Sequence, residues 1–151
     1  MKNIPPKNPH ASLENINNFI TVPATEFISK RDILDPSLFA FLTNHSANDY
    51  TNKNTKLFLS NDFKSGFGIN PDGELISVFS LEKARGKILV KKAVKEGASY
   101  LECMGDKLLE LYSSFGFSPV KITKWDNQFA PKNWNYERFG TPNIYSMRLI
   151  K

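Results

Sequence analysis

The sequence predicts an α/β fold with a mixed sheet flanked by helices. Three observations lead to this prediction. Strand-like apolar segments alternate with helical segments along the whole chain. The turn sequence Pro71-Asp72-Gly73 separates two strand patterns directly. Near the C-terminus, an amphipathic helix ends at Gly116, and a strand pattern starts immediately after it.

The first half of the chain contains two helices between strands. A short strand covers residues 19–22, and a helix follows over residues 25–34 with Phe27, Ile28 and Arg31 on one side. Asp35 and Pro36 suit an N-cap and a first helical position, so a second helix should run to Leu42. The polar residues 44–54 are expected to form a loop. Strands follow at residues 56–60, 66–69 and 74–79, the last being the strongest pattern.

The second half alternates helix and strand. The pattern predicts a helix at residues 86–96 capped by Gly97, a strand at 100–103, a helix at 106–115, and strands at 117–125 and 144–149. Leu108, Leu109, Tyr112 and Phe115 recur at helical spacing and therefore share one face of the helix at 106–115.

Composition and charge are those of one folded domain. The chain has 151 residues, 40% of them hydrophobic, and a formal net charge of +5, which favours an anionic partner. Residues 1–17 carry three prolines and few apolar side chains, so we expect a flexible N-terminal arm, with an ordered arm wrapping the domain as the alternative. The domain itself is expected over residues 18–151.

The location expected from the sequence is the cytoplasm. Cys103 is the only cysteine, so no disulfide can form within the chain, and this suits a reducing compartment. No signal peptide or membrane-spanning segment is visible in the sequence. Two histidines and one cysteine give no metal-ligand spacing, so no metal site is expected.

The segment from Val78 to Ile88 has the pattern of a phosphate-binding loop. A strand ending in Val78-Phe79-Ser80 runs into a loop and then into a helix N-terminus, where unpaired N–H groups attract anions. Gly86 would allow a close approach of the backbone, and Lys83, Arg85 and Lys87 add positive charge. The alternative is a solvated basic helix face with a glycine in the preceding loop.

The run Tyr112-Ser113-Ser114-Phe115-Gly116-Phe117, between a helix and a strand, resembles the C-terminal half of the GNAT superfamily of N-acetyltransferases. The order of predicted elements is also similar to that superfamily. The resemblance implies a single GNAT-like domain with a mostly antiparallel sheet and a splayed central strand pair. It further resembles a divergent group of phages and mobile elements in Leu101-Glu102-Cys103, Trp125-Asp126, Ala130-Pro131, Trp134 and the Gly140-x-Pro142 run.

The resemblance implies an acetyl-CoA-dependent enzyme that transfers an acyl group directly to an amine. Tyr112 would protonate the departing thiolate, the backbone of residues 78–80 would polarise the thioester, and residues 83–88 would bind the pyrophosphate. The residues expected to bind the cofactor are Val78, Phe79, Ser80, Lys83, Arg85, Gly86, Lys87 and Ile88. Lys83 and Ile88 depart from the family's Gln/Arg-x-x-Gly-x-Gly/Ala pattern. Periodicity alone favours a core tyrosine at position 112, whereas the Gly116-Phe117 pair that follows favours the role implied by the resemblance.

Other candidates for chemistry keep more than one interpretation each. Glu74 and Glu102 could serve as a general base or be surface charges. Cys103 lacks a histidine partner in the sequence, and a buried, inert cysteine is the preferred interpretation. The aromatic segment 125–140 could form the acceptor side of a cleft, stack single-stranded bases, or pack as a loop over the sheet.

Two functional hypotheses therefore remain open. The first is a GNAT-type N-acyltransferase with a small-molecule or protein amine as acceptor. The second is a GNAT-fold module that has lost acyl transfer and binds a protein or nucleic acid. Direct nucleic-acid binding driven by charge alone is a weaker third option, because no nucleic-acid motif is present.

Overall fold

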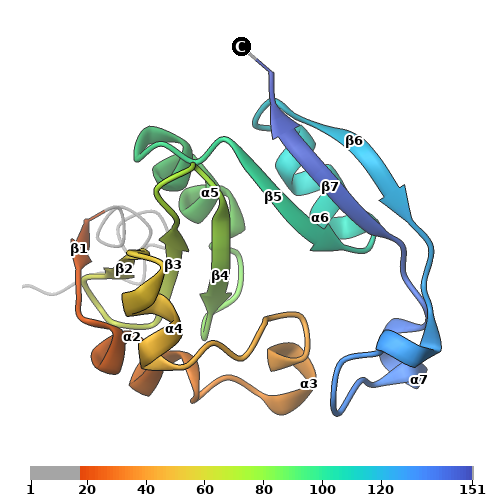
Figure 1. The fold of residues 1–151 in the computed structure, drawn as a ribbon, viewed down its shortest axis with the longest axis horizontal. Coiled ribbons are helices and arrows are strands. Elements are labelled where there is room, and N and C mark those ends of the chain that lie inside the picture. Colours follow the sequence, from red (N-terminus) through yellow and green to blue (C-terminus); the bar gives the residue numbers. More distant parts are fainter. Residues whose placement is uncertain (1–17, 151) are drawn as a thin grey trace, which may run out of the picture.

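Two antiparallel sheets touch each other at one end and diverge from there (Figure 1). The structure, a computed structural model, describes residues 18–150. The first sheet has the order β1-β2-β3-β4 and the second the order β5-β7-β6. The predicted arm at residues 1–17 lies outside the described residues.

The first sheet is a meander of neighbouring strands. Its members are β1 (Phe19–Thr21), β2 (Lys56–Ser60), β3 (Ser65–Ile69) and β4 (Leu75–Ser80). Each strand pairs antiparallel with the next; short turns join β2 to β3 and β3 to β4, whereas residues 22–55 connect β1 to β2. All five residues of β3 are buried, since helices cover both faces of this sheet.

The second sheet is made of β5 (Tyr100–Met104), β6 (Phe117–Thr123) and β7 (Ile144–Leu149). The last strand lies between the other two and is antiparallel to both. The strand predicted at residues 117–125 ends at Thr123, two residues earlier than expected.

Among the helical segments of residues 18–150, four agree with the sequence prediction in place and differ from it in length, whereas three were not predicted. The four are α2 (Ala24–Arg31), α3 (Pro36–Phe39), α5 (Gly86–Lys95) and α6 (Asp106–Ser113), and the three are α4 (Ala47–Asn52), α7 (Tyr136–Phe139) and a 3₁₀ turn (Asn127–Phe129). The helix predicted to reach residue 34 ends at Arg31, and the one predicted to reach Leu42 ends at Phe39. In both cases hydrogen-bonded turns continue past the helix end.

The prediction of a loop at residues 44–54 was wrong, because α4 lies inside it. Ser46 accepts a hydrogen bond from the N–H of Asp49, and the Asp49 carboxylate accepts one from the N–H of Ser46. This capping box satisfies two donors at the helix start and compensates for the polar composition of the segment.

Two groups of apolar side chains hold the helices on the first sheet. Phe27 of α2 and Tyr50 of α4 pack with Leu57, Leu59 and Phe79 on one face. On the other face, α5 packs through Leu89, Val90 and Ala93 in a core that continues beneath the second sheet to α6. The two sheets therefore share one core although they separate at their open end.

The predicted splayed strand pair is confirmed. β4 and β5 are joined by one parallel bridge between Glu74 and Tyr100, where the two strands begin. Beyond that bridge β4 pairs only with β3, and β5 pairs only with β7. Figure 1 shows the two strands parting toward α3 and α7. The facing edges of β4 and β5 consequently border an open space between the sheets.

Candidate functional site

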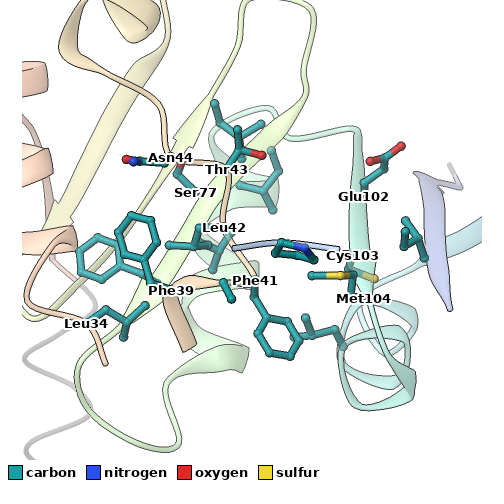
Figure 2. Close-up of a pocket in the computed structure, with 18 of the residues that line it drawn as sticks. Leu34, Phe39, Phe41, Leu42, Thr43, Asn44, Ser77, Glu102, Cys103 and Met104 are labelled. Atoms are coloured by element: carbon teal, nitrogen blue, oxygen red, sulfur yellow. The ribbon is translucent and has the colours of Figure 1, made fainter. Parts of the chain in front are cut away.

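A cleft of about 1410 Å³ occupies the space between β4 and β5. The two strands supply its walls, α6 contributes Leu108, Leu111 and Tyr112, and the chain after α3 crosses it. Figure 2 shows Glu102, Cys103 and Met104 of β5 on one side, with Ser77 and the segment from Phe39 to Asn44 on the other. The cleft is large enough for an extended ligand of drug size or larger.

Strand β4 contains a bulge in the wall of this cleft. Gly66 pairs with Phe79 and Gly68 pairs with Ile76, so β4 has one residue more than β3 over this stretch. Ser77, inside the bulge, has a φ of 56°, which is uncommon for a residue other than glycine. A bulge redirects the backbone and side chains that follow it, and here it lies just before the predicted residues 78–80.

A buried polar network that the sequence analysis did not find surrounds this bulge. The hydroxyls of Tyr50 and Ser77 are 2.7 Å apart, and Arg31 donates to the Tyr50 oxygen at 3.0 Å. All three side chains are buried. Arg31 lies on the face that the helical spacing predicted, but the spacing gave no sign of its partners.

The loop after β4 presents unpaired N–H groups. Within residues 18–150, the backbone N–H groups of residues 83–88 have no hydrogen-bond acceptor. Ala84 has a φ of 64° and Arg85, the N-cap of α5, has a right-handed conformation. Consecutive residues of opposite handedness can direct neighbouring N–H groups to one point, which is the geometry of an anion-binding nest. The first turn of α5 contains no acidic residue that would oppose an anion.

The side chain of Arg85, which was expected to add positive charge to the phosphate-binding loop, is engaged within the protein. It is buried, and it makes two hydrogen bonds to the Asp62 carboxylate, at 2.6 and 3.0 Å, and one to the Ser65 hydroxyl at 3.1 Å. The Arg85 guanidinium, aided by the Ser60 hydroxyl and the Lys64 N–H, holds the pKa of Asp62 well below its usual range, although burial opposes this. We therefore assign the Arg85 side chain to anchoring the loop and only its backbone to the candidate anion site.

Gly86 also has a packing role that the sequence analysis did not predict. A Cβ at this position would lie 2.9 Å from Cδ2 of Leu111 on α6. The missing side chain thus allows α5 and α6 to approach each other. Lys83 and Lys87 are exposed and Ile88 is half-buried; these three do not line the cleft, whereas Val78, Phe79, Ser80, Arg85 and Gly86 do.

Tyr112 combines a packed ring with an unpartnered hydroxyl. It is 5% exposed, and its ring meets Phe117 edge to face at 5.8 Å between centroids. The hydroxyl makes no hydrogen bond within the described part of the chain, and the residue lines the cleft. Burial raises the pKa of Tyr112 above its ordinary value, so the phenol keeps its proton at neutral pH. A buried hydroxyl without a protein partner at a cavity is available to a ligand.

The other residues singled out in the sequence lie around the same cleft. Glu74 and Glu102 both line it, and His45, half-buried, does too. Burial is the main reason that the pKa of His45 is lowered, so its imidazole is neutral at neutral pH. Cys103 is buried with its thiol 3.7 Å from the Met147 sulfur, and burial raises its pKa to about 12, so no thiolate forms.

The aromatic segment 125–140 packs as an ordered structure at the open end of the cleft. Trp134 is buried, donates to the Gly140 carbonyl at 2.8 Å, and contacts Phe41 at 5.0 Å between ring centroids. Trp125 and Phe129 line the cleft, and Phe129 is 77% exposed. This arrangement fits the interpretation of a cleft wall.

Residues 18–150 contain neither a candidate metal centre nor a candidate membrane-spanning helix. No group of three or more His, Cys, Asp and Glu side chains there could hold a metal ion. In the same part of the chain, no helix has the length and apolar character needed to cross a bilayer.

Solved structures of acetyltransferases share this fold. One is a Bacillus subtilis acetyltransferase in complex with CoA, at 16% identity and a TM-score of 0.55, covering 89% of this chain and 98% of its own. The ribosomal-protein-alanine N-acetyltransferase of Brucella melitensis, at 14% identity and TM-score 0.55, covers 89% and 99%. A chimeric spermidine N-acetyltransferase from Vibrio cholerae, at 10% identity and TM-score 0.53, covers 88% and 94%.

The chain therefore has the GNAT fold, as the resemblance in the sequence implied. No protein-family model matches the chain, and no curated protein sequence matches it. At these identities the similarity establishes the fold, and the activity has to be argued from the site.

Proposed function

We propose that this protein is an acetyl-CoA-dependent N-acyltransferase that transfers an acyl group directly to an amine. One observation carries the proposal: the bulged strand β4, the unpaired N–H groups after it and the unpartnered Tyr112 hydroxyl belong to one cleft or its rim. These are the three elements that thioester aminolysis needs: a donor for the oxyanion, a site for the cofactor phosphates and an acid for the leaving group.

The residues present suit acetyl-CoA as the acyl donor. The N–H groups of residues 83–88 and the N-terminus of α5 would bind the pyrophosphate, and Lys83 and Lys87 would add long-range attraction. The backbone of residues 78–80 would bind the thioester oxygen at the open edge of β4. Acetyl-CoA supplies the activated acyl group, and the Bacillus subtilis structure with CoA shows that this fold accommodates the cofactor.

The roles of the side chains follow from the proton balance. A neutral amine attacks the carbonyl carbon, a C–N bond forms, and the C–S bond breaks. Tyr112 gives its proton to the departing sulfur, and the proton lost by the amine restores the phenol through solvent. Because burial raises the pKa of Tyr112, the phenol is protonated when the reaction needs an acid. Glu74 and Glu102 are the candidate bases that receive the proton of the amine.

The proposal specifies the acceptor only as a class of compounds, the amines. Solved structures with this fold include a spermidine N-acetyltransferase and a ribosomal-protein-alanine N-acetyltransferase, so both small-molecule and protein amines are reasonable acceptors. We further propose the cytoplasm as the location, because a chain with a single cysteine suits a reducing compartment.

A binding module without catalysis is the second candidate. It is favoured by the engagement of the Arg85 side chain with Asp62 and by Lys83 and Ile88 at positions that depart from the family pattern. Nucleic acid or protein would then replace acetyl-CoA as the partner.

Calorimetric titration with acetyl-CoA separates the two candidates. We expect saturable binding that weakens with salt and weakens further in a Lys83→Glu/Lys87→Glu variant, each exposed contact contributing about 1 kcal/mol or less. Lys107→Glu/Lys121→Glu, which makes the same change in charge at two exposed lysines that do not line the cleft, is the matched control. Release of free thiol in the presence of spermidine or N-terminal alanine peptides then tests transfer. No heat of binding at about 1 mM acetyl-CoA would favour the binding module.

A further inference from the structure

We propose that Tyr50 and Arg31 are positioning residues that hold the β4 bulge in the conformation needed for acyl transfer. The inference rests on the proposed function, because it assigns the bulge a part in binding the thioester oxygen. Neither residue belongs to β4 or to the loop after it. Both act through one side chain, Ser77, which lies in the bulge.

The bulge requires support from outside the strand. Ser77 has a φ of 56°, and a serine pays a steric penalty there that a glycine would not pay. Such conformations persist only where the surroundings determine them strongly. β3 cannot do so alone, because one β3 residue faces two residues of β4 at this point. β5 is not bonded to β4 at this point either, because the strands have already separated.

Tyr50 provides that support through a single short hydrogen bond. Its hydroxyl lies 2.7 Å from the Ser77 hydroxyl, and both side chains are buried. The Tyr50 oxygen also accepts from Arg31, so the Tyr50 hydroxyl links the guanidinium to the Ser77 hydroxyl. The Tyr50 ring is 1% exposed and meets Phe27 nearly perpendicularly at 5.7 Å, so the hydroxyl cannot move away from the bulge without repacking.

Arg31 fixes Tyr50 in turn. Arg31 is 1% exposed, and its guanidinium donates to the Asp32 carboxylate, the Asn44 amide oxygen and the His45 carbonyl as well as to Tyr50. Its planar donor set is thus distributed over α2, the segment that crosses the cleft and α4. A buried guanidinium with this many partners cannot be displaced without leaving a charge unsatisfied.

The network connects the segment that crosses the cleft with strand β4. Asn44 and His45 line the cleft on the side of the segment that crosses it, and Ser77 lines it on β4. Figure 2 shows Asn44 and Thr43 beside Ser77. A change in the crossing segment would therefore reach the backbone of residues 78–80 through Arg31 and Tyr50. We infer that the alignment of the thioester depends on these two residues although neither contacts it.

Tyr50→Phe and Ser77→Ala test the inference by removing the same hydrogen bond from its two ends. Each should lower kcat by about 10- to 100-fold, the effect of a small misplacement of reacting groups. KM for acetyl-CoA should stay within about twofold, because the loop at residues 83–88 is untouched. The double variant should be no worse than the more affected single variant, since the two changes remove one interaction.

Tyr100→Phe is the matched control. It removes a tyrosine hydrogen bond to Asp72 at the opposite end of β4, and neither residue lines the cleft. Its kcat should equal that of the wild type. Ser77→Gly is a second variant that guards against misfolding, because glycine adopts a positive φ without strain while lacking the hydroxyl. It should keep wild-type thermal stability and still lose turnover.

Amide hydrogen exchange and amide NMR shifts of residues 77–79 provide a readout that is independent of activity. Faster exchange confined to these residues in Tyr50→Phe, together with the loss of kcat, supports the inference. Unchanged amides, or a turnover equal to that of Tyr100→Phe, would overturn it even if the wild type transfers acyl groups. A wild type that binds acetyl-CoA but transfers to no amine, while Tyr50→Phe still changes these amides, would overturn the catalytic part and the proposed function together.

Discussion

The two sides of the cleft are held in place by different kinds of interaction. In residues 18–150, the buried polar and charged side chains are Arg31, Ser60, Ser65, Asn70, Ser77 and Arg85, and all of them precede β5. The side that carries β4 and the loop after it therefore depends on directional hydrogen bonds and ion pairs. The side that carries β5 and α6 depends on apolar contacts around Cys103, Tyr112, Phe117 and Met147.

The difference corresponds to the task proposed for each side. Backbone N–H groups have fixed directions, so a loop or bulge that uses them has to be oriented by bonds from outside, as Asp62 does for Arg85 and Tyr50 for Ser77. A phenol that gives up a proton has to keep its hydroxyl free of protein partners. Packing of the ring alone, as at Tyr112, positions the hydroxyl without engaging it.

The largest effect is expected at Tyr112, on the apolar side. Tyr112→Phe removes the proton donor and little packing, so turnover should fall by roughly 100-fold or more. Thermal stability should change little, because the hydroxyl has no hydrogen bond within the described residues. Steady-state kinetics and thermal unfolding check both parts. A large loss of stability with unchanged turnover would show that Tyr112 is a core residue only.

The pH dependence of that reaction provides a second check on Tyr112. Burial raises its pKa above 10, so the acid stays protonated through neutral and mildly alkaline pH. Turnover at saturating amine should therefore not decline around pH 10 through this group. The effect of pH on the free energy of unfolding has the same direction. The stability that depends on a protonated Tyr112 is fully present below pH 10 and is lost as the pH rises through the pKa of Tyr112 in the folded state.

A smaller effect is expected on the side of the cleft that carries β4, and it should appear in the free energy of unfolding. Asp62→Asn leaves the buried Arg85 without its ionised partner and should lower the free energy of unfolding by about 2–3 kcal/mol at neutral pH. Because the pKa of Asp62 is depressed, the wild type has this stabilisation above pH 3.8 and loses it as the pH falls through the lower folded-state value. Urea unfolding of both proteins at several pH values measures whether their free energies of unfolding converge at low pH.

Glu82→Gln is the control for this prediction. Glu82 pairs with Lys64 at 3.9 Å, and both side chains are about half exposed, so the pair should contribute less than about 1 kcal/mol. An equal loss in Asp62→Asn and Glu82→Gln would show that the Arg85 pair is no stronger than a surface pair. The loop after β4 would then need another explanation for its order.

The sequence predicted the parts of the site that depend on periodicity and order. Helical spacing predicted the helix that carries Tyr112, and the strand-loop-helix pattern predicted where β4 ends and α5 begins. The family resemblance predicted the divergence of β4 and β5. Each of these features is encoded by neighbours in the chain or by the order of elements.

The features that the sequence did not predict depend on contacts between distant residues. Arg85 and Lys87 both look like loop cations, and only the position of Asp62 at the β2–β3 turn decides that Arg85 is buried. The bulge at Ser77 has no glycine to mark it, because Tyr50, 27 residues away, supports its conformation. The α4 helix was missed although Ser46 and Asp49 form its cap, because its six residues are too polar to show an apolar face.

The smallest effect is expected at Gly86, where the two sides of the cleft meet. If Gly86 serves helix packing, Gly86→Ala brings a methyl group to within 2.9 Å of a Leu111 methyl, and that flexible side chain can shift. The better helix propensity of alanine offsets part of the strain, so the change in the free energy of unfolding should stay within about 1 kcal/mol. Affinity for acetyl-CoA should stay within about twofold, because the new methyl points to α6.

A loss of affinity at unchanged stability would instead show that the phosphates need the bare backbone of Gly86, as its position in the sequence first indicated. Combining Gly86→Ala with Leu111→Val should restore any lost stability in the first case and no lost affinity in the second, so calorimetry and unfolding of the double variant separate the two roles.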